Sequence, residues 1–365
     1  MNILQIIPSL DIGGAEVLVA KMAIFLKKIG CNVTILVFVP TDNYLVDLLR
    51  QNEVEIVVSP QKKMPIFGQF YSPYNFIFIN KYIENHRFDI IHAHLTPAQV
   101  SMAIVRLIYK NKIPLITTEH STYNRRRKMI FKLFDYVLYS QFDRIVAISY
   151  ATKKELVKWV PGAVSRCCII HNGIDIGDFQ NPSKAERRVQ KEGLHILSIG
   201  RLHSQKGQDI LLRAFAFTNG MYLYLVGDGL LRKKMEGLVK KLNIEEKVFF
   251  LGNRSDIPDL LMNADIYVQP SLSEGFGIAT LEAMASGLPV VVSNVPGLAD
   301  IVGEAGITFP PGDVKKLASI LILLGSDVSL RNKLSDLAKQ RSTLFSLKSS
   351  VNEYMVLYKD VLRNT

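Results

Sequence analysis

The sequence has few cysteines and no long apolar run. Its 365 residues include three cysteines, whose spacing fits neither a disulfide framework nor a zinc motif. No apolar run reaches the roughly 18 residues that a membrane-spanning helix requires. The N-terminal stretch MNILQIIPSL has no basic segment of the kind that opens a signal peptide. We therefore expect a cytoplasmic protein.

Signatures of a dinucleotide cofactor and of a metal are also lacking. VGDGLL at 226–231 departs from the GxGxxG fingerprint, because Arg232 stands where the third glycine belongs. His92 and His94 share one face of a predicted strand, but no third ligand stands at zinc spacing. No Asp-x-Asp follows a predicted strand in either half. The sequence therefore predicts a protein that needs no cofactor and no metal ion.

Acidic residues are scarce in the first half of the chain. Residues 1–175 hold 21 Lys and Arg against 13 Asp and Glu, a net charge of +8. Residues 176–365 hold 23 against 20, a net charge of +3. A basic half favours anionic partners, either phosphorylated substrates or an anionic membrane surface. Nucleic acid is not expected as a partner, because no recognition motif accompanies the charge.

The basic cluster Arg125–Lys128 (RRRK) stands directly before a run of large apolar side chains. These recur at helical spacing at Ile130, Phe131, Phe134, Val137 and Leu138. Much of this face is expected to pack into the core. The cluster beside an exposed Met129 or Phe131 is nonetheless what an interfacial helix uses to dock on the anionic inner face of a membrane. The alternative is that Phe131 and Phe134 lie in the core and that the cations only solubilise the domain.

Strand-like and helix-like segments alternate along the chain, which predicts parallel sheets built of βαβ units. The pattern lapses into polar sequence at 171–193, where we place a domain boundary. The predicted fold is α/β, with two Rossmann-like domains in series at 1–175 and 176–346. An amphipathic helix is expected in the remaining residues, 347–365.

The stretch EGFGIATLEAMASGLPVVV at 274–292 is rich in chemistry. It predicts a turn, then a helix that begins near Gly277, then a strand. Glycines on both sides of Phe276 indicate a backbone that turns sharply and approaches a ligand closely. Ligands of open α/β sheets bind beyond the carboxyl ends of strands, where Glu274 and Glu282 are suited to accept hydrogen bonds from sugar hydroxyls. The alternative assigns Glu282 to the helix dipole and Glu274 to solvent.

Two other turns are candidate phosphate sites. In IGRLHSQKGQDIL (199–211), Arg201 follows a predicted strand and Lys206 precedes a helix. Two cations beside a helix N-terminus match a diphosphate. Gly13 and Gly14 follow the first strand, so backbone N–H groups there can point at an anion. The alternative for Arg201 and Lys206 is a pair of surface cations with no ligand.

His120 ends the predicted strand PLITTEH. A histidine in this position is suited to donate to a charge that develops near a phosphate or a carbonyl. An ordinary hydrogen-bonded histidine explains the residue equally well.

In this order, the segments GGAE, HAH, TEH, HNGID, GRL with KG, and EGFG continuing to Glu282 resemble the family-4 glycosyltransferases of the GT-B fold. The resemblance covers nearly the whole chain, and its most specific element is the Glu274–Glu282 pair, the E-x7-E signature of that family. It implies two Rossmann-like domains that face a cleft, with the C-terminal helix crossing back to the first domain. The first domain would bind the acceptor and the second the nucleotide-sugar donor.

The resemblance also implies roles for the residues of the second domain. Glu282 would bind the ribose hydroxyls of the nucleotide, and Glu274 the hydroxyls of the donor sugar. The backbone at Phe276 and Gly277 would help to hold that sugar.

Further roles concern the leaving group. By resemblance, Arg201 and Lys206 would hold the diphosphate, and Gly14 would approach it from the first domain. His120 would lie near the anomeric carbon. One departure stands at 294–302, where NVPGLADIV replaces the Gly-Gly-hydrophobic-Pro-Glu turn of many relatives, with Asp300 near the acidic position.

The implied reaction transfers a hexose or N-acetylhexosamine from a nucleotide diphosphate donor, expected to be a UDP-sugar, to an acceptor hydroxyl with retention. The expected setting is cell-surface polysaccharide assembly on a lipid-linked acceptor. Two alternatives stay open: a nucleotide-sugar epimerase of the same fold, and a non-catalytic partner that binds sugar nucleotide.

Overall fold

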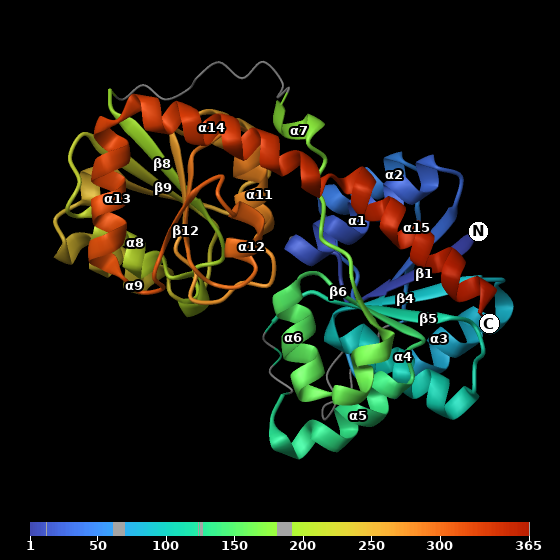
Figure 1. Cartoon of the computed structure of the whole chain (residues 1–365). Helices are drawn as coiled ribbons and strands as arrows, with labels where there is room; N and C mark the ends of the chain where they lie inside the picture. The colour runs from blue at the N-terminus through green and yellow to red at the C-terminus, as the bar shows by residue number, and fades with distance from the viewer. Residues whose placement is uncertain (12, 61–69, 123, 125–126, 181–191, 365) are drawn as a thin grey trace. The chain divides into compact units, whose positions relative to one another are not determined.

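The computed structural model describes residues 1–365 apart from 12, 61–69, 123, 125–126, 181–191 and 365. By internal packing the chain divides into two compact units (Figure 1). Unit 1 combines Met1–Gly173 with Leu347–Thr365, and unit 2 is Ile174–Ser346. The first division thus falls after Gly173, where the sequence suggested residue 175.

Unit 1 is built on a seven-stranded sheet in the order β3-β2-β1-β4-β5-β6-β7, and neighbouring strands pair in parallel. The strands are β1 (Asn2–Ile7), β2 (Asn32–Val37), β3 (Glu55–Val58), β4 (Ile90–His94), β5 (Leu115–Glu119), β6 (Arg144–Ala147) and β7 (Cys167–Ile169). The helices and 3-10 turns are α1 (Gly14–Lys28), α2 (Tyr44–Gln51), α3 (Pro73–Asn85), α4 (Leu95–Tyr109), η1 (Met129–Phe131), α5 (Lys132–Ser140), α6 (Tyr150–Trp159), η2 (Pro161–Arg166) and α15 (Leu347–Arg363).

Unit 2 repeats this architecture with a six-stranded parallel sheet in the order β10-β9-β8-β11-β12-β13. The strands are β8 (Leu194–Ile199), β9 (Met221–Val226), β10 (Val248–Gly252), β11 (Ile266–Gln269), β12 (Val290–Ser293) and β13 (Ile307–Phe309). The helices and 3-10 turns are α7 (Gly177–Gln180), η3 (Ser204–Lys206), α8 (Gln208–Phe215), α9 (Arg232–Lys241), η4 (Glu245–Lys247), α10 (Ile257–Met262), α11 (Ile278–Ala285), α12 (Leu298–Val302), α13 (Val314–Ser326), α14 (Val328–Ser342) and η5 (Thr343–Phe345).

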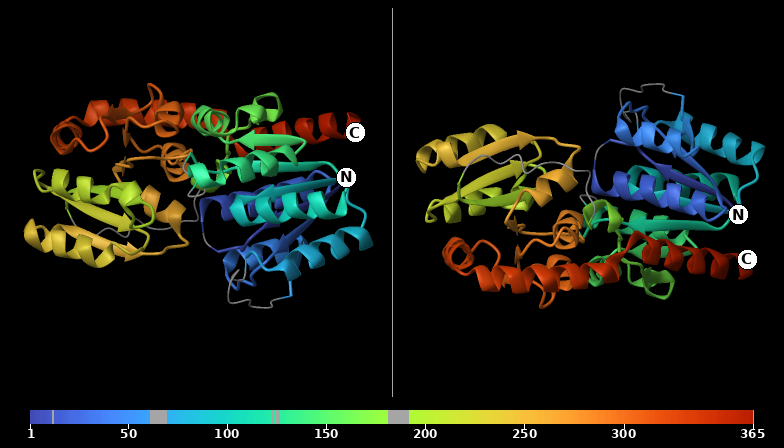
Figure 2. Two further views of the ribbon diagram at one scale, coloured as in Figure 1. Left: turned by 90° about the horizontal axis from the view of Figure 1, so that it is seen from below. Right: turned by 90° about the horizontal axis from the view of Figure 1, so that it is seen from above.

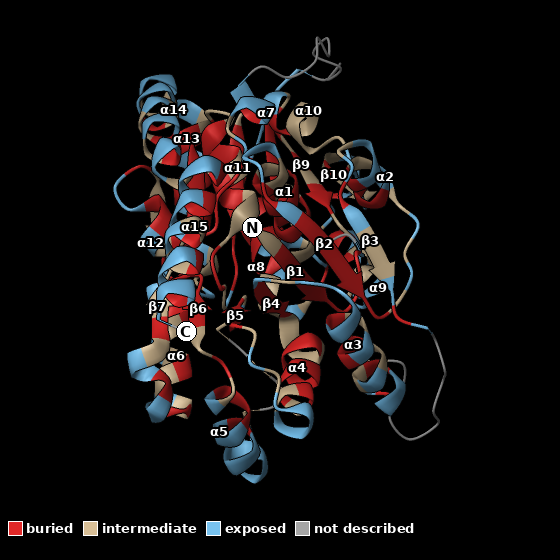
Figure 3. Cartoon of the chain, turned by 90° about the vertical axis from the view of Figure 1, so that its right-hand side faces the viewer, coloured by how far each residue is buried: buried red, intermediate tan, exposed pale blue. Residues whose placement is uncertain are grey.

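Helices cover both faces of each sheet, so the strands are buried on both sides. In β1, Ile3 and Ile7 pack in one apolar cluster with α1, while Leu4 and Ile6 belong to another cluster on the opposite face. Burial on both faces explains why the strands read as nearly continuous apolar runs. Figure 3 shows the strands of unit 1 mostly in the colour of buried residues and the outer sides of the helices in that of exposed ones.

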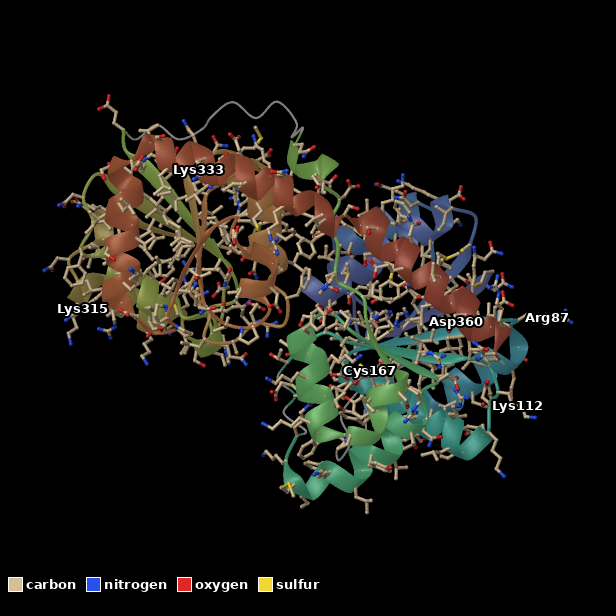
Figure 4. All side chains as sticks on the ribbon, in the orientation of Figure 1. Arg87, Lys112, Cys167, Lys315, Lys333 and Asp360 are labelled. Carbon is tan, nitrogen blue, oxygen red and sulfur yellow. The ribbon has the colours of Figure 1, made fainter. Side chains whose placement is uncertain are left out.

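The last helix, α15, packs in unit 1. Four of its buried residues recur at helical spacing and share the apolar cluster of α1: Val351, Tyr354, Tyr358 and Val361. On its outer side Asp360, labelled in Figure 4, accepts a hydrogen bond from Arg144 Nη2 over 3.3 Å. Both views of Figure 2 place the C-terminal end of this helix near the N-terminus of the chain.

The expectation that the apolar face along η1 and α5 lies mostly in the core is wrong. Only Leu138 of the five residues is buried, and the others are exposed: Ile130, Phe131, Phe134 and Val137. Helix α5 instead turns Asp135 and Tyr139 inward. Asp135 Oδ2 accepts a hydrogen bond from Trp159 Nε1 over 2.8 Å, and Tyr139 OH donates to Glu119 Oε1 over 2.6 Å. These two bonds set the rotation of the helix and leave its apolar face outside.

The strand order places the candidate site residues. It reverses between β1 and β4 in unit 1 and between β8 and β11 in unit 2. Ligands of open parallel sheets bind at such points, outside the carboxyl ends of the strands. In unit 1, Gly13 follows β1 and His94 ends β4. In unit 2, Arg201 follows β8 and Glu274 follows β11.

Candidate active site

Unit 2 brings Lys206 and Glu274 into direct contact. Lys206 ends η3 after β8, and Glu274 lies in the turn after β11. Lys206 Nζ donates to Glu274 Oε2 over 2.6 Å, and the two side chains are only 28% and 16% exposed. A ligand that reaches this strand end therefore meets one cation and one carboxylate side by side.

A chain of buried polar groups leads from β11 to Glu274. Tyr267 OH donates to Gln269 Oε1 over 2.6 Å, and Gln269 Nε2 donates to Ser271 Oγ over 2.9 Å. Ser271 Oγ in turn donates to Glu274 Oε2 over 3.3 Å. None of the first three residues was expected from the sequence. Their alternate spacing, which puts Tyr267, Gln269 and Ser271 on one side of an extended segment, is the signal that points to them.

Both glutamates of the E-x7-E pattern influence the pKa of the same buried tyrosine, Tyr267. Burial, followed by the negative charges of Glu282 and Glu274, raises the pKa of Tyr267 well above its usual value. Glu282 itself is half-buried in α11. The structure therefore brings the two candidate donor-binding carboxylates together around one residue of β11.

The turn that carries Glu274 depends on glycine. Gly277 has a φ of +95° and precedes α11, and a Cβ there would collide with Leu298 Cδ2. Phe276 is buried and packs edge-on against Phe345, with ring centroids 5.8 Å apart. Since the phenyl ring of Phe276 is buried in the core, a ligand at this position could contact the backbone of the residue but not its ring.

The position of Lys206 beside Glu274 depends on a second glycine, at which two backbone segments pack closely. Gly207 has a φ of +63°, and a Cβ there would collide with the carbonyl oxygen of Pro270. The η3 turn therefore packs directly on the turn after β11. The Lys206 side chain also passes beside Gly200, whose Cβ would stand 3.4 Å from Lys206 Cδ. Arg201 is the next residue; it is exposed and forms no ion pair with the residues that the structure describes.

The candidate phosphate turn of unit 1 lies at the start of α1. Gly14 is the first residue of this helix, and Gly13 precedes it without a side-chain cap. A Cβ on Gly13 would collide with Glu16 Oε2, so the Glu16 carboxylate lies beside the helix N-terminus. That position favours a negative charge, and an anionic ligand there would compete with this carboxylate.

Three histidines cluster where β4 and β5 end. His94 Nδ1 lies 3.2 Å from His120 Nε2, and the ring centroids of His92 and His94 are 4.0 Å apart. Burial lowers the pKa of His120 to about 4, and burial together with His120 lowers the pKa of His92 to about 3. The pKa of His94 is also lowered, first by burial. All three rings are therefore neutral at pH 7.

His92 has a structural role in this cluster. Its Nδ1 lies 2.7 Å from Tyr358 OH, and its Nε2 lies 2.8 Å from Thr118 Oγ1, which is 3.1 Å from Tyr354 OH. A neutral imidazole has one donor and one acceptor nitrogen. Both are used here, and they connect α15 with β4 and β5.

The other two histidines keep one nitrogen free of protein partners. His94 Nε2 and His120 Nδ1 are buried and have no hydrogen-bond partner among the described residues. Buried polar atoms without a partner are rare and point to an absent water or ligand. This places His120 among the candidate ligand-binding groups of unit 1.

Neither a metal cluster nor a spanning helix is found in the part of the chain that the structure covers. There, no three His, Cys, Asp or Glu side chains are placed to hold a metal ion together. The same residues include no helix with the length and apolar character needed to cross a bilayer.

Two family profiles match the chain in succession. Residues 12–178 match the profile described as Glycosyltransferase Family 4, and residues 179–341 match the one described as Glycosyl transferases group 1. The O-antigen biosynthesis glycosyltransferase WclY of Escherichia coli is 25% identical to this chain, over 93% of it and 96% of that protein. The N-acetylgalactosamine-N,N'-diacetylbacillosaminyl-diphospho-undecaprenol 4-alpha-N-acetylgalactosaminyltransferase of Campylobacter jejuni is 26% identical, over 67% of this chain and 69% of that protein.

A solved structure of similar fold is that of Anabaena Alr3699/HepE in complex with UDP and glucose. It superimposes with a TM-score of 0.86 at 24% identity, and the match covers 99% of this chain and 100% of that one. The chain belongs to the glycosyltransferases described by these two profiles, and its two parallel α/β units have the GT-B fold. The predicted family and the predicted fold class are confirmed.

Proposed function

We propose that the protein transfers a hexosyl or N-acetylhexosaminyl group from a UDP-sugar to an acceptor hydroxyl, with retention of the anomeric configuration. The observation that carries this proposal is the contact of Lys206 with Glu274 beyond the strand ends of unit 2. A sugar diphosphate presents hydroxyls and phosphate oxygens close to each other. An ammonium group and a carboxylate side by side match these two parts.

The residues of unit 2 divide the work of binding. Glu274 accepts hydrogen bonds from hydroxyls of the donor sugar, and Ser271 holds its carboxylate in place. Glu282 binds the ribose, as the family resemblance implies. Arg201 and Lys206 neutralise the diphosphate.

In the reaction, the bond between the anomeric carbon and the diphosphate oxygen breaks, and its electron pair leaves with the phosphate. The acceptor oxygen forms the new bond on the same face, and its proton passes to the departing phosphate. Arg201 and Lys206 stabilise the negative charge that grows on the leaving group, which lowers the barrier because this charge is largest in the transition state. These cations make a metal ion unnecessary. His120, being neutral, contributes a hydrogen bond and not a positive charge.

The relatives support the donor class and the setting. One is named for O-antigen biosynthesis, and another is named for an acceptor carried on diphospho-undecaprenol. The structure of similar fold holds UDP and glucose. We therefore propose polysaccharide assembly on a lipid-linked acceptor as the setting of the reaction.

A panel of nucleotide sugars tests the proposal. A UDP-sugar should raise the melting temperature of the protein more than the same sugar on another nucleotide. With a lipid-linked acceptor it should then yield a product whose anomeric configuration, read by NMR, matches that of the donor. An inverted product contradicts the mechanism. Conversion of the donor without acceptor indicates an epimerase, and binding without turnover indicates a non-catalytic partner.

A further inference from the structure

The outer face of η1 and α5 exposes a cluster of large apolar side chains. Ile130, Leu133 and Met129 are 82%, 77% and 76% exposed. Four more are exposed beside them: Phe131, Phe134, Tyr136 and Val137. Figure 3 shows α5 largely in the colour of exposed residues. An apolar cluster of this size on two consecutive elements marks an interaction surface.

The rotation of α5 keeps this cluster outside. The opposite side of the helix is held by the hydrogen bond from Trp159 Nε1 to Asp135 and by the bond from Tyr139 to buried Glu119. The η2 turn packs against the same end of the unit, since a Cβ on Gly162 would stand 3.2 Å from the ring of Tyr136. The apolar side chains therefore have no core to turn into.

Charge of one sign surrounds the cluster. From residue 120 to residue 142 the sequence contains a single acid, Asp135, and its side chain is buried. Lys128 and Lys132 are exposed within the same stretch, and Lys158 is exposed on α6. Lys132 Nζ lies 5.8 Å from the centroid of the Trp159 ring. The outward charges that the structure describes in this stretch are thus positive.

The basic cluster at 125–128 does not act as one group. Arg125 and Arg126 lie outside the described residues. Arg127 turns inward: its side chain is 11% exposed, its Nη2 lies 3.7 Å from Glu119 Oε2, and its Nη1 donates to the carbonyl oxygen of Thr122 over 2.8 Å. Arg127 therefore anchors the segment that leads into η1, and replacing it would disturb the fold.

We propose that this η1–α5 surface, formed by the seven apolar residues above with Lys128 and Lys132, docks the protein on an anionic lipid bilayer. Apolar side chains that project from a helix face beside lysines match the two layers of such a membrane, the acyl boundary and the negative headgroups. A protein partner would need acidic groups to pair with the lysines, whereas an anionic membrane supplies the apolar and the negative part together. The inference goes beyond the proposed function, because docking requires no sugar transfer.

Co-sedimentation of the full chain with vesicles tests the proposal. The protein should pellet with vesicles that mix phosphatidylglycerol and phosphatidylcholine, release at high salt because exposed charges are then screened, and ignore pure phosphatidylcholine. The double variant Ile130→Ser/Leu133→Ser and the double variant Lys128→Gln/Lys132→Gln should each lower the partition coefficient at least about 10-fold. Arg127 is left intact in both.

Matched controls carry the same substitutions elsewhere. Phe217 and Val356 are also exposed apolar residues, and Lys233 and Lys234 are exposed lysines of unit 2. Phe217→Ser/Val356→Ser and Lys233→Gln/Lys234→Gln should pellet like the wild type. Unchanged circular dichroism and melting temperature show that each variant is folded.

The single tryptophan gives a second readout that does not depend on pelleting. Trp159 is the only tryptophan of the chain, and it lies beside Lys132 and Asp135 at the edge of the η1–α5 surface. Docking should bring it near the bilayer, so lipids brominated along the acyl chain should quench its fluorescence in anionic vesicles only. The proposal is overturned if the Ile130→Ser/Leu133→Ser variant pellets and is quenched like the wild type. It is also overturned if the wild type ignores vesicles but forms a dimer that this variant loses, since the face then joins two copies of the chain.

Discussion

Polar side chains gather at the strand ends of both units, but burial acts on them in different ways. In unit 2, Lys206 meets Glu274 over 2.6 Å, a cation against an anion. In unit 1, His94 meets His120 over 3.2 Å, and burial lowers the pKa of His120 to about 4. A covered group keeps its charge when an opposite charge compensates for lost water, and gives it up otherwise. The strand ends of unit 2 therefore carry charged groups, whereas those of unit 1 carry neutral histidines that can form hydrogen bonds.

The largest expected effect comes from removing the cations of unit 2. Lys206→Ala or Arg201→Ala should lower kcat/KM by roughly 10²-fold or more, about 3 kcal/mol, because in the proposed function each cation stabilises charge that grows on the leaving diphosphate. Steady-state kinetics measure the loss. Lys315, an exposed lysine labelled in Figure 4, supplies the matched control Lys315→Ala, which should behave like the wild type. Near wild-type turnover in both site variants would remove the assignment.

Low pH should destabilise unit 1, because its buried histidines are neutral in the folded state. The pKa of His120 falls from 6.5 to about 4 on folding, so the folded state binds fewer protons than the unfolded state between these values. The stability that comes from the neutral ring is thus complete above the unfolded pKa and is lost as the pH falls toward the folded one. The slope is at most about 1.4 kcal/mol per pH unit for each such histidine.

Urea unfolding at several pH values, followed by Trp159 in unit 1, measures this slope. The control is His120→Gln, which cannot titrate at this position and should lower the slope between pH 7 and pH 5; the rest of the slope comes from His92 and His94, whose pKa values burial also lowers. An equal slope in the two proteins would show that His120 does not contribute.

A smaller effect is expected from the hydrogen-bonded chain that leads from Tyr267 to Glu274. Ser271→Ala removes the hydroxyl that donates to Glu274 Oε2 over 3.3 Å. We expect kcat/KM to fall about 10-fold, since a hydrogen bond to a charged carboxylate is worth roughly 1.5 kcal/mol. Ser271→Thr keeps the hydroxyl and should restore most of the activity, whereas a purely structural role would leave the two variants equally impaired. Ser319→Ala, at an exposed serine of α13, serves as the control.

Removal of metal ions is expected to have no effect on activity. Because the proposed function assigns neutralisation of the leaving group to Arg201 and Lys206, activity should persist in excess EDTA. A complete loss that Mn²⁺ or Mg²⁺ restores would overturn the metal-free mechanism and would assign part of the neutralisation to a bound ion.

The sequence predicted the fold class because its signals are local. Apolar runs of strand length alternate with helical periodicity in both halves, and the structure has parallel sheets of seven and six strands. The sequence pattern did not predict two short strands: β7 with the residues CCI and β13 with ITF. Three residues are too few to establish a period, and these strands exist because they extend a sheet that is already formed.

For the candidate site, the sequence determined which turns follow strands, and this placed Arg201, Lys206 and Glu274 at strand ends. Only the tertiary structure decided their contacts. The hydrogen bond from Lys206 to Glu274 joins positions 68 apart, and that between His92 and Tyr358 joins positions 266 apart. Such pairs depend on strand order, which no local pattern contains.

Helix α5 shows the same limit. Its sequence determined a helix with an apolar face, but the bonds of Asp135 to Trp159 and of Tyr139 to Glu119 decided that this face lies outside. Periodicity says which side chains share a face. Which face is buried depends on partners from distant parts of the chain, because buried polar groups must be satisfied wherever the fold places them.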